Sequence, residues 1–571
     1  LNGTIATSND AIVFGAVTLG ANTIVDTNAT NGTGDITLAA VTGGNNTLTL
    51  TTENNIAGAD ITASGAIAGV TTLTLASVGG TATLSADVDV TTLSVNNTVA
   101  NVVFTGNGSS VVNAVAFAND GTLTLGQDGG TQTYNGGLTT TSVGGTVTLN
   151  GTIATSNDAI VLGAVTLGSA TTIDTNATGN AADITVAAIT GGSNNLTLST
   201  GDNVAGADIT ASGAISGLGN LTLADVGGTA TFSNNVAAAQ VSADNTVANV
   251  SFTGGTNTFS GAASFANDGT LIFGDATGDS FTFNGGLNTS SVAGTVTLNT
   301  SISSSDDALT FGAVTLGNNV TIDTNSTTTN RADITLGAVT GGNNTLTLTT
   351  ENNVTGSNVT ASGAISGVTT LTLASVGGTA TLSADVDVTT LSVDNTVANV
   401  AFTGNGSSVV NAVAFANDGT LTLGTSGGTQ TYNGGLTTTS VGGTVTLNGT
   451  IATSNDAIVF GAVTLGSNTI VDTNATNGTG DITLAAVTGG NNTLTLTTEN
   501  NVANADITAS GAISGVTTLT LASVGGTATL SADVDVTTLS VDNTVANVAF
   551  TGNGSSVVNA VAFANDGTLT L

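Results

Sequence analysis

The feature that most constrains this chain is an internal repeat of 148 or 149 residues. The segment LNGTIATSNDAIVFGAVTLG begins at Leu1, a copy with one substitution begins at Leu149, a diverged copy begins at Leu298, and the first version returns at Leu447. The segments that begin at Thr360 and Thr508 are identical over 64 residues. Tandem copies this similar indicate recent duplication, and they predict an architecture in which each unit is supported by its neighbours.

Inside each repeat the sequence is a series of short alternating segments, such as TLTLTT from Thr47 and TLTLAS from Thr72. Between them lie turn sequences such as GG, NN and NDG. Strand-sized runs of period two that are separated by Gly and Asn indicate β-structure. No stretch shows the apolar spacing of a helix, so the sequence predicts an all-β fold.

The four copies act as internal mutants that show which side chains point inward. At the position of Ile12-Val13-Phe14 the third copy has Leu309-Thr310-Phe311, so only the middle residue accepts a polar replacement. Because strand side chains alternate between two faces, the outer two residues belong in the core. The same argument predicts a set of inward and outward residues: Ile12, Phe14, Leu48, Leu50, Leu73, Leu75 and Leu84 inward, and Val13, Thr49 and Thr74 outward.

Short strands without intervening helices favour a solenoid over a sandwich array or a propeller. A sandwich array would carry Pro-punctuated linkers, and a propeller would repeat about every 40–50 residues. The spacing of the strands predicts turns of about 20–24 residues, roughly 25 turns in all, and six or seven in each repeat. We therefore expect a parallel β-solenoid, a right-handed β-helix, forming one continuous rod of repeats 1–148, 149–297, 298–446 and an incomplete 447–571.

The composition removes several classes of function. The chain has no Cys, His, Met, Trp or Pro, its only basic residue is Arg331, and its formal net charge is −36. A zinc site of the usual ligands, a thiol nucleophile and a Ser-His-Asp triad are therefore excluded. The charge opposes binding to nucleic acid, and no apolar run is long enough to span a membrane. A Cys-free, strongly acidic chain without an initiating Met indicates a fragment of an extracellular protein.

Two phrases carry a family resemblance, GDITLAAVTGGNNTLTLTTENN from Gly34 and GGTATLSADVDVTTLSV from Gly79. They resemble the repeats of filamentous-haemagglutinin-type adhesins and autotransporter-like bacterial surface proteins, and the resemblance extends over essentially the whole chain. It implies a right-handed parallel β-helix, export from a bacterium, and a role in adhesion or surface structure.

One loop in each repeat is a candidate calcium site. The loop DTNATNGTGD runs from residue 26 to residue 35, and its copies keep an acid at each end and an Asn two residues after the first acid. Calcium takes six to eight oxygen ligands, which Asp, Asn and backbone carbonyls can supply. The competing interpretation is that Asp and Asn only form turns. The candidate ligands are Asp26, Asn28, Asp35, Asp174, Asn176, Asp183, Asp323, Asn325, Asp333, Asp472, Asn474 and Asp481.

Other recurring residues have simpler interpretations. The acids Glu53, Glu351 and Glu499 recur, and paired carboxylates can hydrolyse glycosides, but a catalytic pair repeated along one chain would be unusual. The NDG triplet at Asn119 predicts a tight turn with its Gly at positive φ. Outward Thr residues can order water on a flat face, but their T-x-T sites look scattered over all strands rather than one per turn.

We therefore expect a structural, rod-like segment of a secreted or cell-surface bacterial fibre, without catalytic activity. The main alternative is an adhesin stalk that recognises a host or neighbouring cell, and a remote alternative is a β-helical glycan-active enzyme. No cofactor is predicted apart from the calcium alternative. The expected partners are adjacent solenoid segments of the same or identical chains, and a cell surface or matrix, with no nucleic acid.

Overall fold

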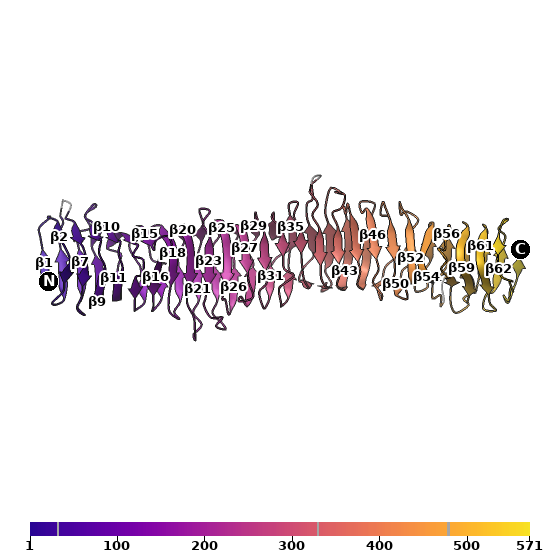
Figure 1. Cartoon of the computed structure of the whole chain (residues 1–571), viewed down its shortest axis with the longest axis horizontal. Helices are drawn as coiled ribbons and strands as arrows, with labels where there is room; N and C mark the ends of the chain where they lie inside the picture. The colour runs from indigo at the N-terminus through magenta and orange to yellow at the C-terminus, as the bar shows by residue number, and fades with distance from the viewer. Residues whose placement is uncertain (31–33, 328–329, 477–479) are drawn as a thin grey trace. The chain divides into compact units, whose positions relative to one another are not determined.

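The computed structural model describes residues 1–30, 34–327, 330–476 and 480–571, and every regular element among them is a β-strand. The chain divides into two units, Leu1–Phe281 with Ser291–Thr295, and Thr282–Ser290 with Val296–Leu571. In each unit parallel strands stack as the turns of a β-solenoid, with about 21 residues between successive turns and about 27 turns in the chain (Figure 1). The predicted all-β, parallel solenoid is therefore confirmed.

In the described part of the first repeat and its junction with the second there are eighteen strands, many of only two to four residues. These strands are β1 (Gly3–Ala6), β2 (Ile12–Phe14), β3 (Val17–Thr18), β4 (Thr23–Asp26), β5 (Ile36–Leu38), β6 (Val41–Thr42), β7 (Leu48–Thr51), β8 (Ile61–Ala63), β9 (Ile67–Ala76), β10 (Val78–Leu84), β11 (Val88–Val95), β12 (Val99–Phe104), β13 (Ser110–Val111), β14 (Val115–Ala116), β15 (Leu123–Leu125), β16 (Thr131–Tyr134), β17 (Leu138–Thr139) and β18 (Val147–Ala154).

Each turn of the first unit contributes to three parallel faces, which we call A, B and C after β1, β2 and β3, with which they begin. Face A continues through β4 and β7, face B through β5 and β8, and face C through β6. The longer strands β9 and β11 cross a corner, so their first halves belong to face C and their second halves to face A.

The core is built from the inward residues of these alternating strands. Leu48, Leu50, Leu73, Leu75 and Leu84 are buried, whereas Thr49 and Thr74 point outward and are only half-covered by their neighbours in the ladder. Ile12 is 6% exposed and Val13 is 71% exposed, as the copies predicted. Phe14 is half-buried in the first turn, but its counterparts Leu162, Phe311 and Phe460 are buried.

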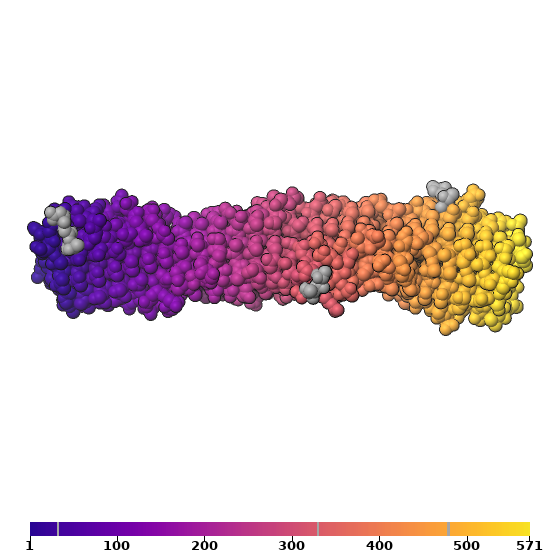
Figure 2. Space-filling view, turned by 90° about the horizontal axis from the view of Figure 1, so that it is seen from above, coloured from indigo at the N-terminus to yellow at the C-terminus, as the bar shows by residue number. Residues whose placement is uncertain are grey.

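The outward threonines form ladders in register, which differs from the scattered arrangement that the sequence suggested. On face B, Thr37 pairs with Thr62 and Thr62 with Thr83. Further along the same face, Thr124, Thr148, Thr166 and Thr190 follow one another on successive turns. Outward Thr residues that look scattered along the sequence are thus brought into columns by the winding. Figure 2 shows one face of the outer surface, coloured by residue number.

A sequence repeat does not contain a whole number of turns. The ladder that starts in β1 reaches Leu138 in β17 after six turns and Ile160 in β19 (Ile160–Leu162) after seven. Ile153, the counterpart of Ile5, lies between them in the second half of β18 and pairs with Gln132 on face C. The repeat is therefore six and two-thirds turns long, and equivalent residues of repeats 1 and 2 occupy different faces of the first unit.

The second unit shows the same displacement between its two repeats. The second half of β43 (Ile365–Ala374) belongs to the ladder of β38 (Val320–Asp323) and β41 (Thr345–Thr349). Its counterpart, the second half of β59 (Ile513–Ala522), belongs instead to the ladder that contains the first half of β43. Equivalent surface features of the two repeats thus lie on different faces within this unit.

The NDG turns correct one prediction. Gly121 was expected at positive φ, but its φ lies outside that region, and the same is true of Gly269, Gly419 and Gly567. A Cβ on Gly121 would lie 2.5 Å from Asn101 Oδ1 and 2.8 Å from the carbonyl oxygen of Ala100. Glycine is needed here because the preceding turn approaches the backbone closely, not because the turn requires an unusual dihedral angle.

Candidate functional site

The first acid of each candidate calcium loop ends a strand and organises the turn that follows. Asp26 is the last residue of β4, and its Oδ1 accepts a hydrogen bond of 2.8 Å from the backbone N–H of Asn28. Asn28 has φ of 44° and donates from Nδ2 to the carbonyl of Thr7 in the preceding turn, at 3.0 Å. The other three copies make the same two contacts, in Asp174 with Asn176, Asp323 with Asn325 and Asp472 with Asn474.

The second acid of each loop is directed to the following turn. Asp35 Oδ1 accepts a hydrogen bond of 3.0 Å from the backbone N–H of Asp60. The equivalent contacts join Asp183 to Asp208, Asp333 to Asn358 and Asp481 to Asp506, at 2.7 to 2.9 Å. The two acids of a loop thus serve different backbone groups.

These contacts give the candidate ligands a structural role in turn formation. Among the described residues, no three or more Asp or Glu side chains are grouped so that they could hold a metal ion. The middle of three of these loops, at 31–33, 328–329 and 477–479, lies outside the described residues. Calcium binding by the twelve candidate residues stays a prediction.

Two of the loops bring carboxyl groups of adjacent turns together. Burial raises the pKa of Asp323 to about 6, and the neighbouring Glu351 carboxyl adds to this, whereas the hydrogen bond from Asn325 acts in the opposite direction. Burial likewise raises the pKa of Asp472 to about 6, with Glu499 as the carboxyl neighbour. In repeat 2, where Gly201 replaces the Glu, burial still raises the pKa of Asp174.

The Glu of each pair stands in a strained turn. Glu351, Asn352 and Asn353 all have positive φ, at 48°, 49° and 48°, and the same holds for the triplets that begin at Glu53 and Glu499. Three consecutive non-glycine residues in the left-handed region are unusual, because each Cβ then approaches a carbonyl oxygen. The turn holds the Glu side chain next to the Asp of the adjacent turn, so the acid pair is part of the folded turn.

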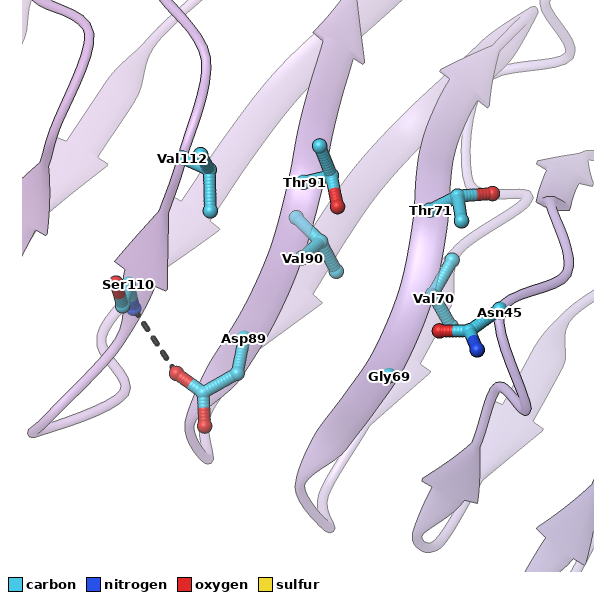
Figure 3. A pocket seen from close by; sticks show the side chains of 9 residues that line it. All are labelled: Asn45, Gly69, Val70, Thr71, Asp89, Val90, Thr91, Ser110 and Val112. Atoms are coloured by element: carbon cyan, nitrogen blue, oxygen red, sulfur yellow. Dashed lines mark hydrogen bonds between the residues drawn. The ribbon is translucent and has the colours of Figure 1, made fainter.

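A shallow groove lies on the outer surface of the first repeat, and no local sequence pattern predicts it. It lies where β9 and β11 cross from face C to face A, and its volume is about 340 Å³ (Figure 3). Gly69, with φ of +69°, forms a bulge there, because Asp89 pairs with Ala68 but Val90 pairs with Val70. The groove is lined by Asn45, Gly69, Val70, Thr71, Asp89, Val90, Thr91, Ser110 and Val112.

The groove presents one acid and one exposed apolar side chain. Asp89 is exposed, and its Oδ1 accepts a hydrogen bond of 3.1 Å from the backbone N–H of Ser110, as the dashed line in Figure 3 shows. Val112 is 54% exposed, whereas Val70 and Val90, on the neighbouring strands of the groove, are buried. The backbone N–H of Val112 donates to the carbonyl of Val90 at 3.1 Å, which holds the Val112 segment against β11.

The same groove recurs in every repeat with one difference. In repeat 3 the equivalents of Asp89 and Val112 are Asp387 and Val410, and in repeat 4 they are Asp535 and Val558. In repeat 2 the counterpart of Asp89 is Ala237, and the counterpart of Val112 is Ser260. The repeats thus contain three acidic grooves and one neutral variant.

Within the part of the chain that the structure describes, no helix is long and apolar enough to cross a membrane. Comparisons with known proteins give no family model, no curated protein and no solved structure that matches this chain.

Proposed function

We propose that this chain is a structural segment of a secreted or cell-surface bacterial fibre, in which stacked turns extend or assemble an extracellular filament. The observation that carries the proposal is the set of parallel ladders that join successive turns within each unit. Among the described residues most interior strands pair with a strand before them and one after them, and inward Leu, Ile and Val form a core that passes from turn to turn. Such a stack resists bending because each turn is supported by its two neighbours.

The repeats support the same proposal. Their near identity means that the number of repeats can change without new contacts, which suits a spacer whose useful property is length. The resemblance to filamentous-haemagglutinin-type repeats and the strongly acidic composition agree with a location outside a bacterial cell. The fibre needs no catalytic group and no cofactor, and its nearest partners are solenoid segments of the same or identical chains.

The second candidate function is an adhesin stalk that takes part in recognition of a cell or matrix. The recurrence of an acidic groove in three repeats favours it, because a passive spacer has no need of a repeated concave surface. The two functions are compatible, since a stalk that binds along its length is still a spacer.

Immunogold labelling of cells that produce the protein tests the location and the filament together. Antibodies against the repeats should label extended material outside the cell, at many positions along each filament. Changing the number of repeats in the gene should change the filament length by about 30 Å for each repeat, since each turn adds about 4.8 Å. Label confined to the cell interior, or a length that does not follow the repeat number, would contradict the proposal.

A further inference from the structure

We propose that the three acidic grooves are docking surfaces for a basic segment of a partner protein, with one Lys or Arg side chain seated in each groove. The proposal goes beyond the structural role of the solenoid and does not depend on it. It rests on the chemistry of the groove, on its charge, and on the difference between repeat 2 and the other repeats.

The chemistry of the groove fits a long cationic side chain. Lys and Arg have an apolar stem that packs on apolar surface and a charged head that prefers a carboxylate. Val112 provides exposed apolar surface for the stem, and Asp89 provides the carboxylate. A carboxylate has about four acceptor positions, so the hydrogen bond from Ser110 leaves capacity for the incoming cation.

The charge of the chain selects a basic partner and excludes a second copy of this chain as the source of the cations. The formal net charge is −36, and Arg331 is the only basic residue, so the chain cannot fill three grooves with its own cations. A surface of one sign attracts a partner of the opposite sign and speeds its association.

Repeat 2 shows that the groove residues are not needed for folding. With Ala237 and Ser260 in place of the acid and the valine, the strands β25 (Ile215–Ala224) and β27 (Val236–Ala243) keep a register shift at the same place and pair on both sides of it, without a pair equivalent to Ala68 and Asp89. A groove of about 360 Å³ persists there without either side chain. The Asp and Val can therefore be exchanged in experiments without loss of the fold.

The winding separates the grooves. In the first unit the groove of repeat 1 lies at the corner of faces C and A, and that of repeat 2 lies at the corner of faces B and C, because β25 crosses from one to the other. The grooves of repeats 3 and 4 also lie on different faces within the second unit. A short basic segment thus engages one groove at a time, and the sites should act independently.

The test measures binding of a fluorescent, N-acetylated and C-amidated lysine hexapeptide to the whole chain by anisotropy and calorimetry. Ionic strength is about 0.15 M, so that diffuse attraction is largely screened. We expect three equivalent sites, one for each acidic groove. The triple variant D89N/D387N/D535N should weaken binding about tenfold or more, because the charge partner of each lysine is lost.

The matched control is D120N/D418N/D566N, which removes the same charge from exposed turn residues of the same three repeats. It should change the affinity by less than about twofold. The gain-of-function variant A237D/S260V should add a fourth site in repeat 2. Equal weakening by both triple variants would show that the attraction is diffuse, and an unchanged number of sites in A237D/S260V would show that the groove is not the binding unit. Either result would overturn the proposal.

Discussion

Repeats 1 and 2 have a similar pattern of strands and turns but different core side chains. In repeat 1 the inward face of β16 presents Gln132 and Tyr134, both buried, and the phenol donates a hydrogen bond of 3.0 Å to Gln132 Oε1. Gln132 Nε2 in turn donates to the carbonyl of Phe104 at 2.8 Å. In repeat 2 the same two positions are Phe281 and Phe283.

The neighbouring aromatic residues change together with this pair. Tyr134 meets Phe104 and Phe117 edge-on, at ring distances of 6.3 Å. In repeat 2, Phe232 stacks on Phe252 at 4.8 Å, and Phe252 stacks on Phe273 at 6.2 Å, where repeat 1 has Leu84, Phe104 and Leu125. A hydrogen-bonded Gln–Tyr pair and a column of stacked Phe rings are thus two alternative ways to pack the same part of the solenoid core.

The comparison indicates that the turn residues specify how the chain winds. The choice of core side chains is limited by their volume and by the hydrogen bonds that polar side chains need. Some turn residues, such as the Asp-Asn pairs and the NDG triplets, do not change between the repeats. Core positions such as Gln132 and Tyr134 change together, and the polar pair is replaced by two apolar residues.

Deleting part of a turn should have the largest effect. Loss of residues 72–81 removes the face A half of β9, so the next strand is forced onto the wrong face, and Leu48 and Leu93 lose their partner Leu73. We expect loss of cooperative unfolding and aggregation, because inward residues arrive where turns belong. Circular dichroism and analytical ultracentrifugation provide the measurement.

Deletion of residues 149–297 is the matched control, and it should leave the fold intact although the repeat is not a whole number of turns. Val147, which pairs with Val165, would then meet Val314, the residue that pairs with Val296. No contact changes type, because partners are set by local turn length and not by position around the axis. If this deletion unfolds as readily as the short one, the repeats are not equivalent modules.

The second prediction breaks the polar pair of repeat 1. Q132A should lower local stability by about 3 kcal/mol, because it leaves a cavity and the phenol of Tyr134 without an acceptor. It also removes the side-chain donor to the Phe104 carbonyl, which keeps its hydrogen bond from the backbone N–H of Gly126. The double variant Q132F/Y134F introduces the two residues that repeat 2 has at these positions, and it should lower the stability by less than about 1.5 kcal/mol.

Amide hydrogen exchange of peptides from the two repeats measures both variants. The unmodified pair Gln430 and Tyr432, which makes the same contact at 3.0 Å, is the internal control. Should the single and double variants open equally readily, the two residues do not act as a unit.

The sequence predicted the inward register and the solenoid because both depend on period-two alternation within one strand, as at Leu48 and Thr49. It did not predict which strand lies beside which. That depends on turn length, which varies from 18 residues between Val147 and Val165 to 26 between Ile189 and Ile215. The Thr ladders, the groove and the Asp323–Glu351 pair all arise from this stacking, so no local pattern revealed them.

The third prediction tests a feature that the two repeats share. G121A and G269A should each cost about 1–3 kcal/mol, since a Cβ at either position would lie 2.5 Å from an Asn side-chain oxygen of the preceding turn. G15A, where no atom lies within 4 Å of the added Cβ, is the neutral control. Thermal unfolding should show the same loss for both NDG variants. A clear difference between them would mean that the turns, like the cores, differ between repeats.

The smallest effect concerns pH, and it extends the comparison to the acid pairs that repeat 2 lacks. Because the pKa of Asp323 in the folded chain is about 6, above its ordinary value of 3.8, the fold favours the protonated form. The stability from this group is therefore fully present below about pH 4 and is lost as the pH rises through about 6. Since Asp323 is only half-buried, solvent screening reduces the expected effect to about 1 kcal/mol.

D323N keeps an acceptor for the N–H of Asn325 but carries no charge, so it should be more stable than the parent at pH 7 and equal to it at pH 4. The control D333N changes an acid that also accepts a backbone hydrogen bond, from Asn358, and it measures the effect of an Asp-to-Asn change outside the Asp323–Glu351 pair. Hydrogen exchange of peptides around residues 320–326, compared between variant and parent at each pH, cancels the intrinsic effect of pH on exchange.

E351Q should shift the pH at which the parent loses this stability to a lower value, because it removes the carboxylate next to Asp323 while the burial that dominates the pKa remains. If E351Q abolishes the pH dependence completely, the charge of Glu351 and not burial is the main cause, and repeat 2, which has Gly201 at this position, should then show no raised pKa at Asp174.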